Sequence, residues 1–329
     1  MSSVARTDRN APRATPAPAG GPADARLTRA REVCRDITKR EAGNFYWGLR
    51  LTPEPRRSAL YAIYAWMRRA DDEADGAAPV EERRALLRSR RATLDKLRRA
   101  GAQPPDDPVW LVLHDTLTRY DIGVAPFEAM LDGLEEDLDH TPYETRDDLA
   151  RYCRRVASTV GVACVSVWGL RDGVARDEAL GLAERRGVGF QITNILRDIA
   201  EDLGRGRVYI PSSDLRAHDL TADDLRAWKH PERCAELVRS LCAWARAEYQ
   251  ASAPLDTMID PACLPTLRAM TSIYAGLLDR IERDPQRVVR ERVRLSKARK
   301  LTIAIGAVAG AKLGAGRSGA GAPAGREGA

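Results

Sequence analysis

Two pairs of aspartates, each with a spacing of four residues, constrain the fold of this chain more than any other feature of its sequence. Asp71 and Asp75 form the first pair, and Asp198 and Asp202 form the second. Residues four positions apart share one face of an α-helix, so each pair predicts a helix with two carboxylates on a single face. The direction in which each face points therefore decides what the pairs can bind.

The apolar stripe of the first helix points its aspartates toward the core. This stripe runs from Leu60 through Ile63 to Met67, and Asp71 and Asp75 continue it. Burying carboxylates without a partner is costly, and a divalent cation would remove that cost. Mg²⁺ characteristically binds one or two carboxylates together with phosphate oxygens of a substrate. Two such faces opposite each other would hold several Mg²⁺ ions.

The second helix carries a longer polar stripe beside its apolar one. Gln191, Asn194, Asp198 and Asp202 follow one another at steps of three, four and four residues. Asn194 adds a neutral oxygen ligand one turn before Asp198. Because oxygen ligands of this kind suit a hard cation, we expect metal ions on this helix as well.

Arginines accompany both helices. Arg68 and Arg69 precede the first pair, and Arg197 lies next to Asp198 in the second. In the loop after the second helix, Arg205 and Arg207 alternate with glycines. A guanidinium group binds phosphate oxygens in a bidentate manner. Acids and arginines together predict a substrate that is both phosphorylated and metal-bound, with the loop as its cover.

Solvent-facing helices offer an alternative interpretation, because 30% of the residues are charged. Either aspartate pair alone fits an exposed face as well as a buried one. A third acidic run, formed by Asp132, Glu135, Glu136, Asp137 and Asp139, is interpreted as a solvated helix face. Two core-facing pairs that are both accompanied by arginine favour a shared site instead.

Helical periodicity dominates the remainder of the chain and predicts an all-α fold. Helices are expected near residues 27–42, 55–76, 80–100, 107–120, 126–138, 146–170, 175–203, 231–250, 262–283 and 295–312. Composition rich in Ala, Pro and Gly predicts disordered tails at residues 1–25 and 314–329, around one catalytic domain at 26–313. The apolar stretch 301–313 is too short to span a membrane and is interpreted as a core helix, with a helix that lies on a membrane surface as the alternative.

Charge and cysteine content limit the partners and the compartment. The net charge of +6 is spread along helices with acids in between, so we expect no nucleic-acid partner. The six cysteines form no Cys-x-x-Cys pair and the four histidines are scattered, which argues against a zinc or disulfide framework. We expect a cytoplasmic protein without an obligate protein partner. A peripheral contact with the inner face of the membrane, which would help an apolar product to leave, stays open.

The segment from Tyr152 to Ala163 combines an aromatic residue with small residues at a spacing of four. Small residues allow close packing of helices, and they also leave room for a long apolar ligand, so both interpretations stay open. Tyrosines at such places usually belong to a core. Where they face a cavity, their rings would stabilise a carbocation.

At these motifs the sequence resembles the squalene and phytoene synthase family of head-to-head prenyl diphosphate synthases. The resemblance runs from about Asn44 to Arg299 and rests on residues 62–75, 152–161 and 191–211. It implies an all-α isoprenoid-synthase bundle with a central cavity and three Mg²⁺ ions that bind with the substrate. One departure is Ala42-Gly43 ahead of Phe45, where many members carry serines.

The resemblance also implies roles for individual residues. The positions that match metal ligands are Asp71, Asp75, Asn194, Asp198 and Asp202. The positions that match substrate contacts are Tyr64, Arg68, Gln191, Arg197, Arg207, Tyr274 and Arg292, with Asn194 among them. Tyr152 joins the four aspartates as a catalytic residue.

The reaction implied is the Mg²⁺-dependent 1'-1 condensation of two prenyl diphosphates through a cyclopropylcarbinyl diphosphate. Our first choice is a phytoene synthase, which joins two geranylgeranyl diphosphates. A presqualene diphosphate or squalene synthase, which joins two farnesyl diphosphates, is the alternative, and NADPH is needed only if squalene is the final product. A non-catalytic helical assembly factor of the same family is an alternative from another class.

Overall fold

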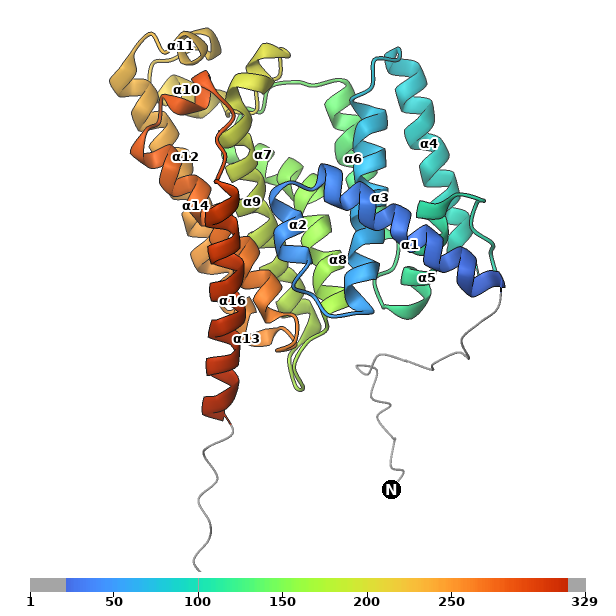
Figure 1. Cartoon of the computed structure of the whole chain (residues 1–329). Helices are drawn as coiled ribbons and strands as arrows, with labels where there is room; N and C mark the ends of the chain where they lie inside the picture. Colours follow the sequence, from blue (N-terminus) through green and yellow to red (C-terminus); the bar gives the residue numbers. More distant parts are fainter. Residues whose placement is uncertain (1–21, 100, 319–329) are drawn as a thin grey trace, which may run out of the picture.

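The computed structural model of the 329-residue chain describes residues 22–99 and 101–318 (Figure 1). These residues form helices and no β-sheet, and a single bridge joins Leu170 to Ile259. The predicted all-α fold is confirmed. In chain order the elements are α1 (Pro22–Glu41), α2 (Asn44–Leu49), α3 (Arg56–Ala74), α4 (Val80–Leu97), α5 (Pro108–Arg119), α6 (Ala125–Leu138), α7 (Arg146–Cys153), the π-helical η1 (Arg154–Ser158), α8 (Thr159–Trp168), α9 (Arg176–Gly204), α10 (Ser212–Ala217), α11 (Ala222–Ala227), α12 (Pro231–Ala251), α13 (Leu255–Met258), α14 (Leu264–Arg283), α15 (Arg287–Arg290) and α16 (Lys297–Ser318).

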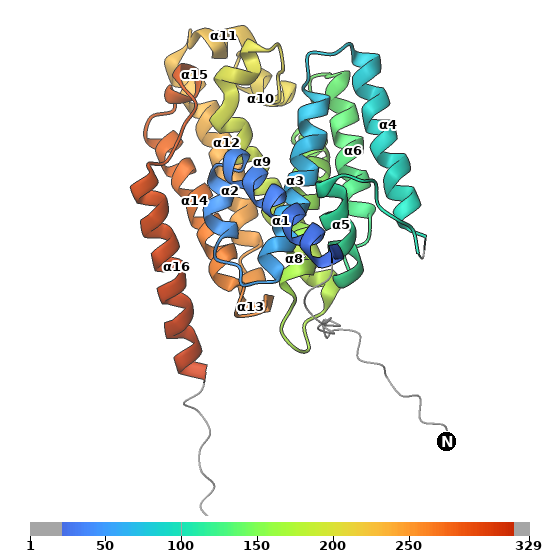
Figure 2. The same cartoon turned by 45° about the vertical axis from the view of Figure 1, so that its right-hand side comes forward.

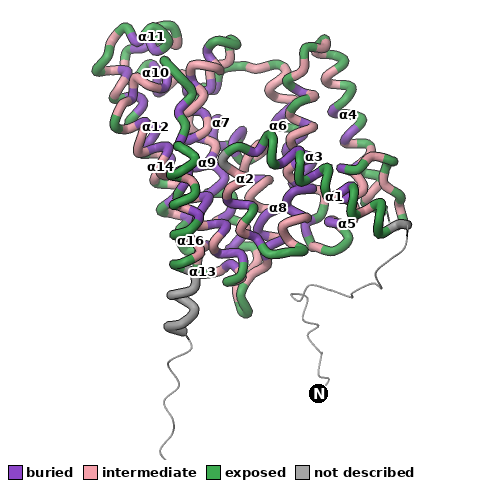
Figure 3. The backbone as a smooth tube through the Cα atoms, in the orientation of Figure 1, coloured by how far each residue is buried: buried purple, intermediate pink, exposed green. Residues whose placement is uncertain are grey.

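The helices form two groups that face each other across the centre of the molecule. One group contains α3, α4, α5 and α6, and the other contains α9, α12 and α14 (Figures 1 and 2). Helix α8 packs against α3, α6 and α9, so it joins the two groups. Buried residues lie where the groups meet, and exposed residues cover the outer helices (Figure 3). The acidic helices α3 and α9 thus belong to opposite groups.

Glycines let α9 approach the segment that leads into α8. A Cβ atom at Gly187 would lie 2.5 Å from the Cα atom of Ser158, and one at Gly161 would lie 3.0 Å from the carbonyl oxygen of Ala183. Such distances leave no room for a side chain, so the two helices touch backbone to backbone. The small residues around Gly161 therefore serve close packing, which is one of the two functions predicted for them.

The long helices lie close to their predicted positions, whereas short ones are absent from the prediction. The predicted helix at 146–170 is one helical run that contains the π-helical segment η1. Helices α2, α10, α11, α13 and α15 span four to six residues each, which is too short for an apolar repeat to develop. Helix α11 nevertheless carries a recognisable start signal, because Thr221 and Asp224 form a capping box.

The interpretation of residues 301–313 as a core helix is wrong for residues 301–310, whose side chains the structure describes. Helix α16 packs on α14 and α2 at the surface, and Leu301 and Ile305 are 49% and 61% exposed. Among its described side chains only Ala304 is buried. The many small residues of this stretch raised its hydropathy without giving it an apolar face wide enough for burial.

Both ends of the helical body extend past the predicted domain limits. Helix α1 begins at Pro22 and α16 ends at Ser318, so each reaches into a range predicted to be a tail. The rest of the two predicted tails lies outside the described residues. None of the helices that the structure describes is long and apolar enough to cross a membrane.

Candidate active site

A cavity of about 1060 Å³ lies between the two groups of helices. This volume is at the upper end of the range found for small-molecule sites in proteins. Every residue that the sequence assigns to the site lines it, namely Tyr64, Arg68, Asp71, Asp75, Tyr152, Gln191, Asn194, Arg197, Asp198, Asp202, Arg207, Tyr274 and Arg292. Their assigned roles remain predictions. Arg69 lies elsewhere and pairs with Asp107 at 2.7 Å.

Arginines pair with the aspartates on the α3 side of the cavity. Arg68 Nη1 donates to Asp71 Oδ2 at 3.0 Å, within the same helix. Arg207 Nη2, in the loop after α9, donates to Asp75 Oδ1 at 2.8 Å. Burial, opposed by Arg68 and reinforced by Asp75, raises the pKa of Asp71 to about 6. Asp71 therefore carries its negative charge at a desolvation cost.

Asp198 on α9 is bound by two arginines from different parts of the chain. Arg197 donates to its two oxygens at 2.8 and 2.5 Å, and Arg292 Nε lies 2.9 Å from Oδ1. Asp202 has no such partner in the described residues. Burial, together with the charges of Asp198 and Glu201, raises the pKa of Asp202 to about 7. A positive charge placed beside Asp202 would relieve this cost.

Asn194, one helical turn before Asp198, has a side-chain oxygen without a hydrogen-bond partner among the described residues. Its Nδ2 donates to Gln191 Oε1 at 3.2 Å, whereas its Oδ1 is buried and accepts no hydrogen bond from the residues that the structure describes. An unpaired buried acceptor is costly, and a cation would satisfy it. Asn194, Asp198 and Asp202 thus have the donor chemistry of a Mg²⁺ site.

The carboxylates do not converge on one point by themselves. In the described part of the chain, no group of three or more His, Cys, Asp or Glu side chains is arranged to hold an ion. A Mg²⁺ ion here would bind one or two carboxylates and fill its remaining positions with water or phosphate oxygens, which is how this ion commonly binds in proteins. The residues fit a metal that enters together with a phosphorylated substrate.

Asp137 on α6 is a site residue that the sequence interpretation missed. It lines the cavity, and burial raises its pKa to about 6. Its Oδ2 accepts from the Tyr152 hydroxyl at 2.6 Å, and its Oδ1 accepts from the Tyr209 hydroxyl at 3.0 Å. The interpretation of this residue as part of a solvated face is therefore wrong. The neighbouring acids of the run do lie on the surface, where Asp132, Glu135 and Asp139 pair with arginines of α4.

A signal for Asp137 was present in the sequence. Met130 and Leu134 form the buried stripe of α6, and Asp137 continues that stripe in the same way as Asp71 continues the stripe of α3. The surrounding acids concealed it, because five carboxylates in eight residues look like a uniform charged face. Tyr209, which stacks on Tyr152 with ring centroids 5.4 Å apart, was also not assigned to the site.

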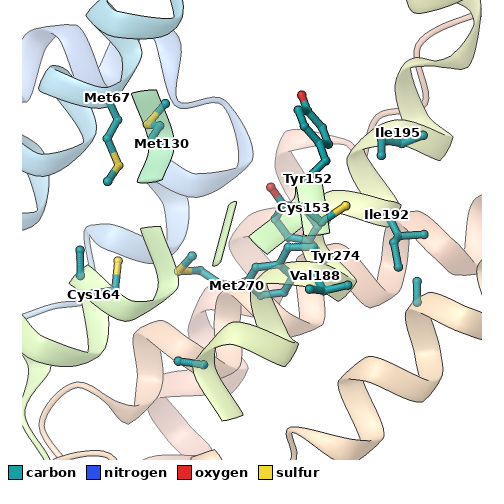
Figure 4. Packing of buried hydrophobic residues seen from close by; sticks show 14 of the residues in the cluster. Met67, Met130, Tyr152, Cys153, Cys164, Val188, Ile192, Ile195, Met270 and Tyr274 are labelled. Carbon is teal, nitrogen blue, oxygen red and sulfur yellow. The ribbon is translucent and has the colours of Figure 1, made fainter. Parts of the chain in front are cut away.

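Many of the other residues that line the cavity are apolar. They include Val156, Ala157, Val160, Cys164 and Trp168 on the η1–α8 run, with Phe190, Met67, Met130, Leu267 and Met270 from other helices. Tyr274 stacks on Phe190 at a centroid distance of 4.3 Å. Figure 4 shows Met67 and Met130 together on one side, with Tyr152, Tyr274 and Met270 on the other. The second prediction for the small residues near Tyr152, room for an apolar ligand, therefore agrees with the cavity.

An acidic, arginine-lined end and a long apolar end suit a ligand with a phosphorylated head and a hydrocarbon tail. Fold and site together define a helical prenyltransferase. The chain belongs to the squalene/phytoene synthase family, whose sequence profile matches residues 38–299. The predicted resemblance is thus confirmed.

Individual relatives agree with this assignment. A 15-cis-phytoene synthase of Synechococcus elongatus is 35% identical over 290 residues, which cover 84% of this chain and 92% of the relative. A phytoene synthase of Mycobacterium tuberculosis is 34% identical over 287 residues, which cover 86% and 92%. Among solved structures, a dehydrosqualene synthase in complex with a ligand superposes with a TM-score of 0.79 and 27% identity, covering 88% of this chain and 99% of the other. A squalene synthase from Alicyclobacillus acidocaldarius gives a TM-score of 0.71 and 27% identity, with coverage of 79% and 95%.

Proposed function

We propose that this protein is a phytoene synthase, which condenses two geranylgeranyl diphosphates head to head into phytoene through a cyclopropylcarbinyl diphosphate. The observation that carries the proposal is that one cavity is lined both by the two aspartate pairs and by many apolar side chains. The curated relatives named above, which carry the name phytoene synthase, support the choice of product. Condensation of prenyl diphosphates is the chemistry that the family performs.

We infer that Mg²⁺ binds with the substrate at Asp71 and Asp75 on one side and at Asn194, Asp198 and Asp202 on the other. The unpaired Oδ1 of Asn194 and the raised pKa of Asp202 support this inference. Bound Mg²⁺ would neutralise charge on the diphosphate leaving group. Without substrate, the arginines supply part of the positive charge that the carboxylates need.

The arginines hold the diphosphate in this proposal. Arg68, Arg197, Arg207 and Arg292 each contact an aspartate of the site, so their guanidinium groups already point into the charged end of the cavity. A diphosphate that enters with cations would replace the carboxylates as the partner of these arginines, and the cations would bind the carboxylates. The arginines then bind the departing pyrophosphate, which favours cleavage of its bond to carbon.

The tyrosines and the apolar walls stabilise the allylic cation that remains after the diphosphate has left. Tyr64, Tyr152 and Tyr274 line the cavity, and their rings and oxygens stabilise positive charge in a space without bulk water. Attack by the double bond of the second substrate gives a new carbocation, and loss of a proton from it closes the cyclopropyl ring. A second ionisation, rearrangement and loss of a proton then give the phytoene-type triene.

Incubation of the purified protein with farnesyl or geranylgeranyl diphosphate tests the proposal. Each reaction contains Mg²⁺, with or without NADPH, and the products are identified by mass. We expect pyrophosphate release and a C40 triene from geranylgeranyl diphosphate, no effect of NADPH, and no product after chelation of the metal. A C30 product as the main outcome would replace the proposal with the farnesyl alternative. No pyrophosphate from either substrate would favour the non-catalytic assembly factor.

A further inference from the structure

We propose that Arg186 closes the deep end of the cavity and limits the prenyl chain that the protein accepts to 20 carbons. This inference rests on the proposed function, because it assumes that the cavity holds prenyl tails. It concerns a residue to which neither the family motifs nor the aspartate pairs give a role. Arg186 lies on α9, on the N-terminal side of the metal-binding stripe.

Arg186 is a charged side chain in an apolar place. It lines the cavity although the residue is only 3% exposed. Apolar residues of three other helices also line the cavity, among them Trp168 at the end of α8, Leu255 on α13 and Leu267 on α14. An apolar residue would close the deep end at a lower desolvation cost, so the arginine indicates a requirement beyond packing.

The guanidinium group of Arg186, on α9, contacts residues at α12, α13 and α14. Its Nε donates to Ser252 Oγ at 2.7 Å, and its Nη2 donates to the Ser252 carbonyl oxygen at 2.9 Å, just after α12. Its Nη1 donates to Thr271 Oγ1 on α14, and its Nη2 lies 3.5 Å from Asp256 Oδ1 on α13. A tail that pushed past Arg186 would have to break these bonds inside the protein, where no water replaces them. Arg186 therefore blocks the passage of a longer prenyl tail.

The position of Arg186 along α9 corresponds to a particular chain length. Twelve residues separate it from Asp198, which is about 18 Å along the helix. An extended carbon chain advances about 1.2 Å per bond, so the 15 main-chain bonds of a C20 prenyl group span about 18 Å, those of a C15 group about 13 Å and those of a C25 group about 23 Å. Side chains of helical residues lean toward the N-terminus, so the Arg186 side chain reaches toward Ala183, which also lines the cavity, and fills space beside it. A C25 tail would need that space.

Shortening the Arg186 side chain tests whether this residue limits the length of the prenyl tail. We expect Arg186→Ala to raise the ratio of kcat/KM for the C25 diphosphate to that for the C20 diphosphate by about tenfold or more, in line with the discrimination that one extra apolar group allows. The matched control is Arg185→Ala. Arg185 is its sequence neighbour, pairs with Glu248 at 3.0 Å on the outside and does not line the cavity. This control should keep the wild-type ratio.

A second variant covers the case in which Arg186→Ala does not fold. Val160→Phe adds a ring to the cavity wall on α8, nearer to the acids than Trp168, and it leaves the Arg186 bonds in place. If the closed end of the cavity limits the length of the prenyl tail, this variant should shift the preference of the protein from C20 to C15 substrates. Thermal unfolding and circular dichroism establish that each variant is folded.

The outcomes separate this inference from the proposed function. Wild-type protein that releases no pyrophosphate from any prenyl diphosphate contradicts the function itself. Wild-type protein that uses C25 as well as C20, or a folded Arg186→Ala that keeps the wild-type ratio, overturns the role of Arg186 alone. A Val160→Phe variant without a shift toward C15 would also overturn it.

Discussion

Arg207 donates a hydrogen bond to Asp75 at 2.8 Å, although 132 residues separate them in the chain. The contact joins the loop after α9 to the end of α3, so it links the two helices that carry the aspartate pairs. Arg205, two residues earlier, lies 3.8 Å from the same carboxylate and has an exposed side chain. Two arginines of one loop therefore have unequal access to the site.

The first prediction follows from this difference. Arg207→Ala should lower kcat/KM about a hundredfold, because it removes a donor from the charged end of the cavity. Arg205→Ala should change kcat/KM by only a few-fold, because its main partner is Glu201 in the last turn of α9, at 2.9 Å. Steady-state kinetics with geranylgeranyl diphosphate measure both. Equal losses in the two variants would contradict the assignment.

The second prediction concerns the carboxylates. Asp71→Asn and Asp198→Asn should each lower kcat by a hundredfold or more. The unfolding temperature should stay the same or rise in Asp71→Asn, because asparagine keeps the shape and removes a charge that is costly to bury, whereas it should fall somewhat in Asp198→Asn, because Arg197 loses its partner. Asp132→Asn is the control, since Asp132 is exposed on α6 and pairs with Arg91 at 2.5 Å. Loss of activity that is accompanied by unfolding would show a structural role instead.

The third prediction concerns pH. Burial raises the pKa values of Asp71, Asp137 and Asp202 to about 6, 6 and 7, above the value of about 3.9 in an unfolded chain. Between about pH 4 and 7 the folded protein therefore binds more protons than the unfolded chain, and these groups lower the free energy of unfolding as pH rises.

Thermal unfolding of metal-free protein measures this effect. The unfolding temperature of wild type minus that of Asp71→Asn/Asp202→Asn should decrease as the pH rises from about 5 to about 7.5. Addition of Mg²⁺ and pyrophosphate at the upper pH should raise the unfolding temperature of wild type more than that of the variant. A difference that grows with pH would refute the raised pKa values.

The fourth prediction concerns Asp137. Its carboxylate holds the hydroxyls of Tyr152 and Tyr209, so Asp137→Asn should lower kcat about ten- to a hundredfold with little change in KM, as is common for residues that orient other site residues. Tyr209→Phe removes one of the two bonds and should cause a smaller loss. Asp139→Asn serves as the control because Asp139 is exposed and pairs with Arg84 at 2.8 Å. Wild-type kcat in a folded Asp137→Asn would contradict this role.

Much of this protein follows from helical periodicity. Asp71 continues the apolar stripe of α3, and the polar stripe from Gln191 to Asp202 lies on one face of α9, because an α-helix repeats every 3.6 residues regardless of its neighbours. The fold class and the cavity-facing positions of these two helices could therefore be predicted. Where the period is interrupted or too short, as in α2 or α13, the same reasoning found nothing.

Asp137 and residues 301–313 show where periodicity misleads. In α6 a mixture of exposed and buried acids hides the one carboxylate that turns inward. In α16 small residues give high mean hydropathy to a helix that lies on the surface. Both errors have the same cause, since burial depends on which helix packs alongside and not on the residue types of one helix alone.

By itself the sequence determined which residues share a face of each helix, and hence the all-α fold, the two acidic faces and the family. Only the tertiary structure decided which arginine meets which aspartate, that Asp137 joins Tyr152 to Tyr209, and that Arg186 lines the cavity. The physical reason is that side-chain periodicity is a property of one helix, whereas these contacts join helices far apart in the chain, whose separation is set by how the whole core packs.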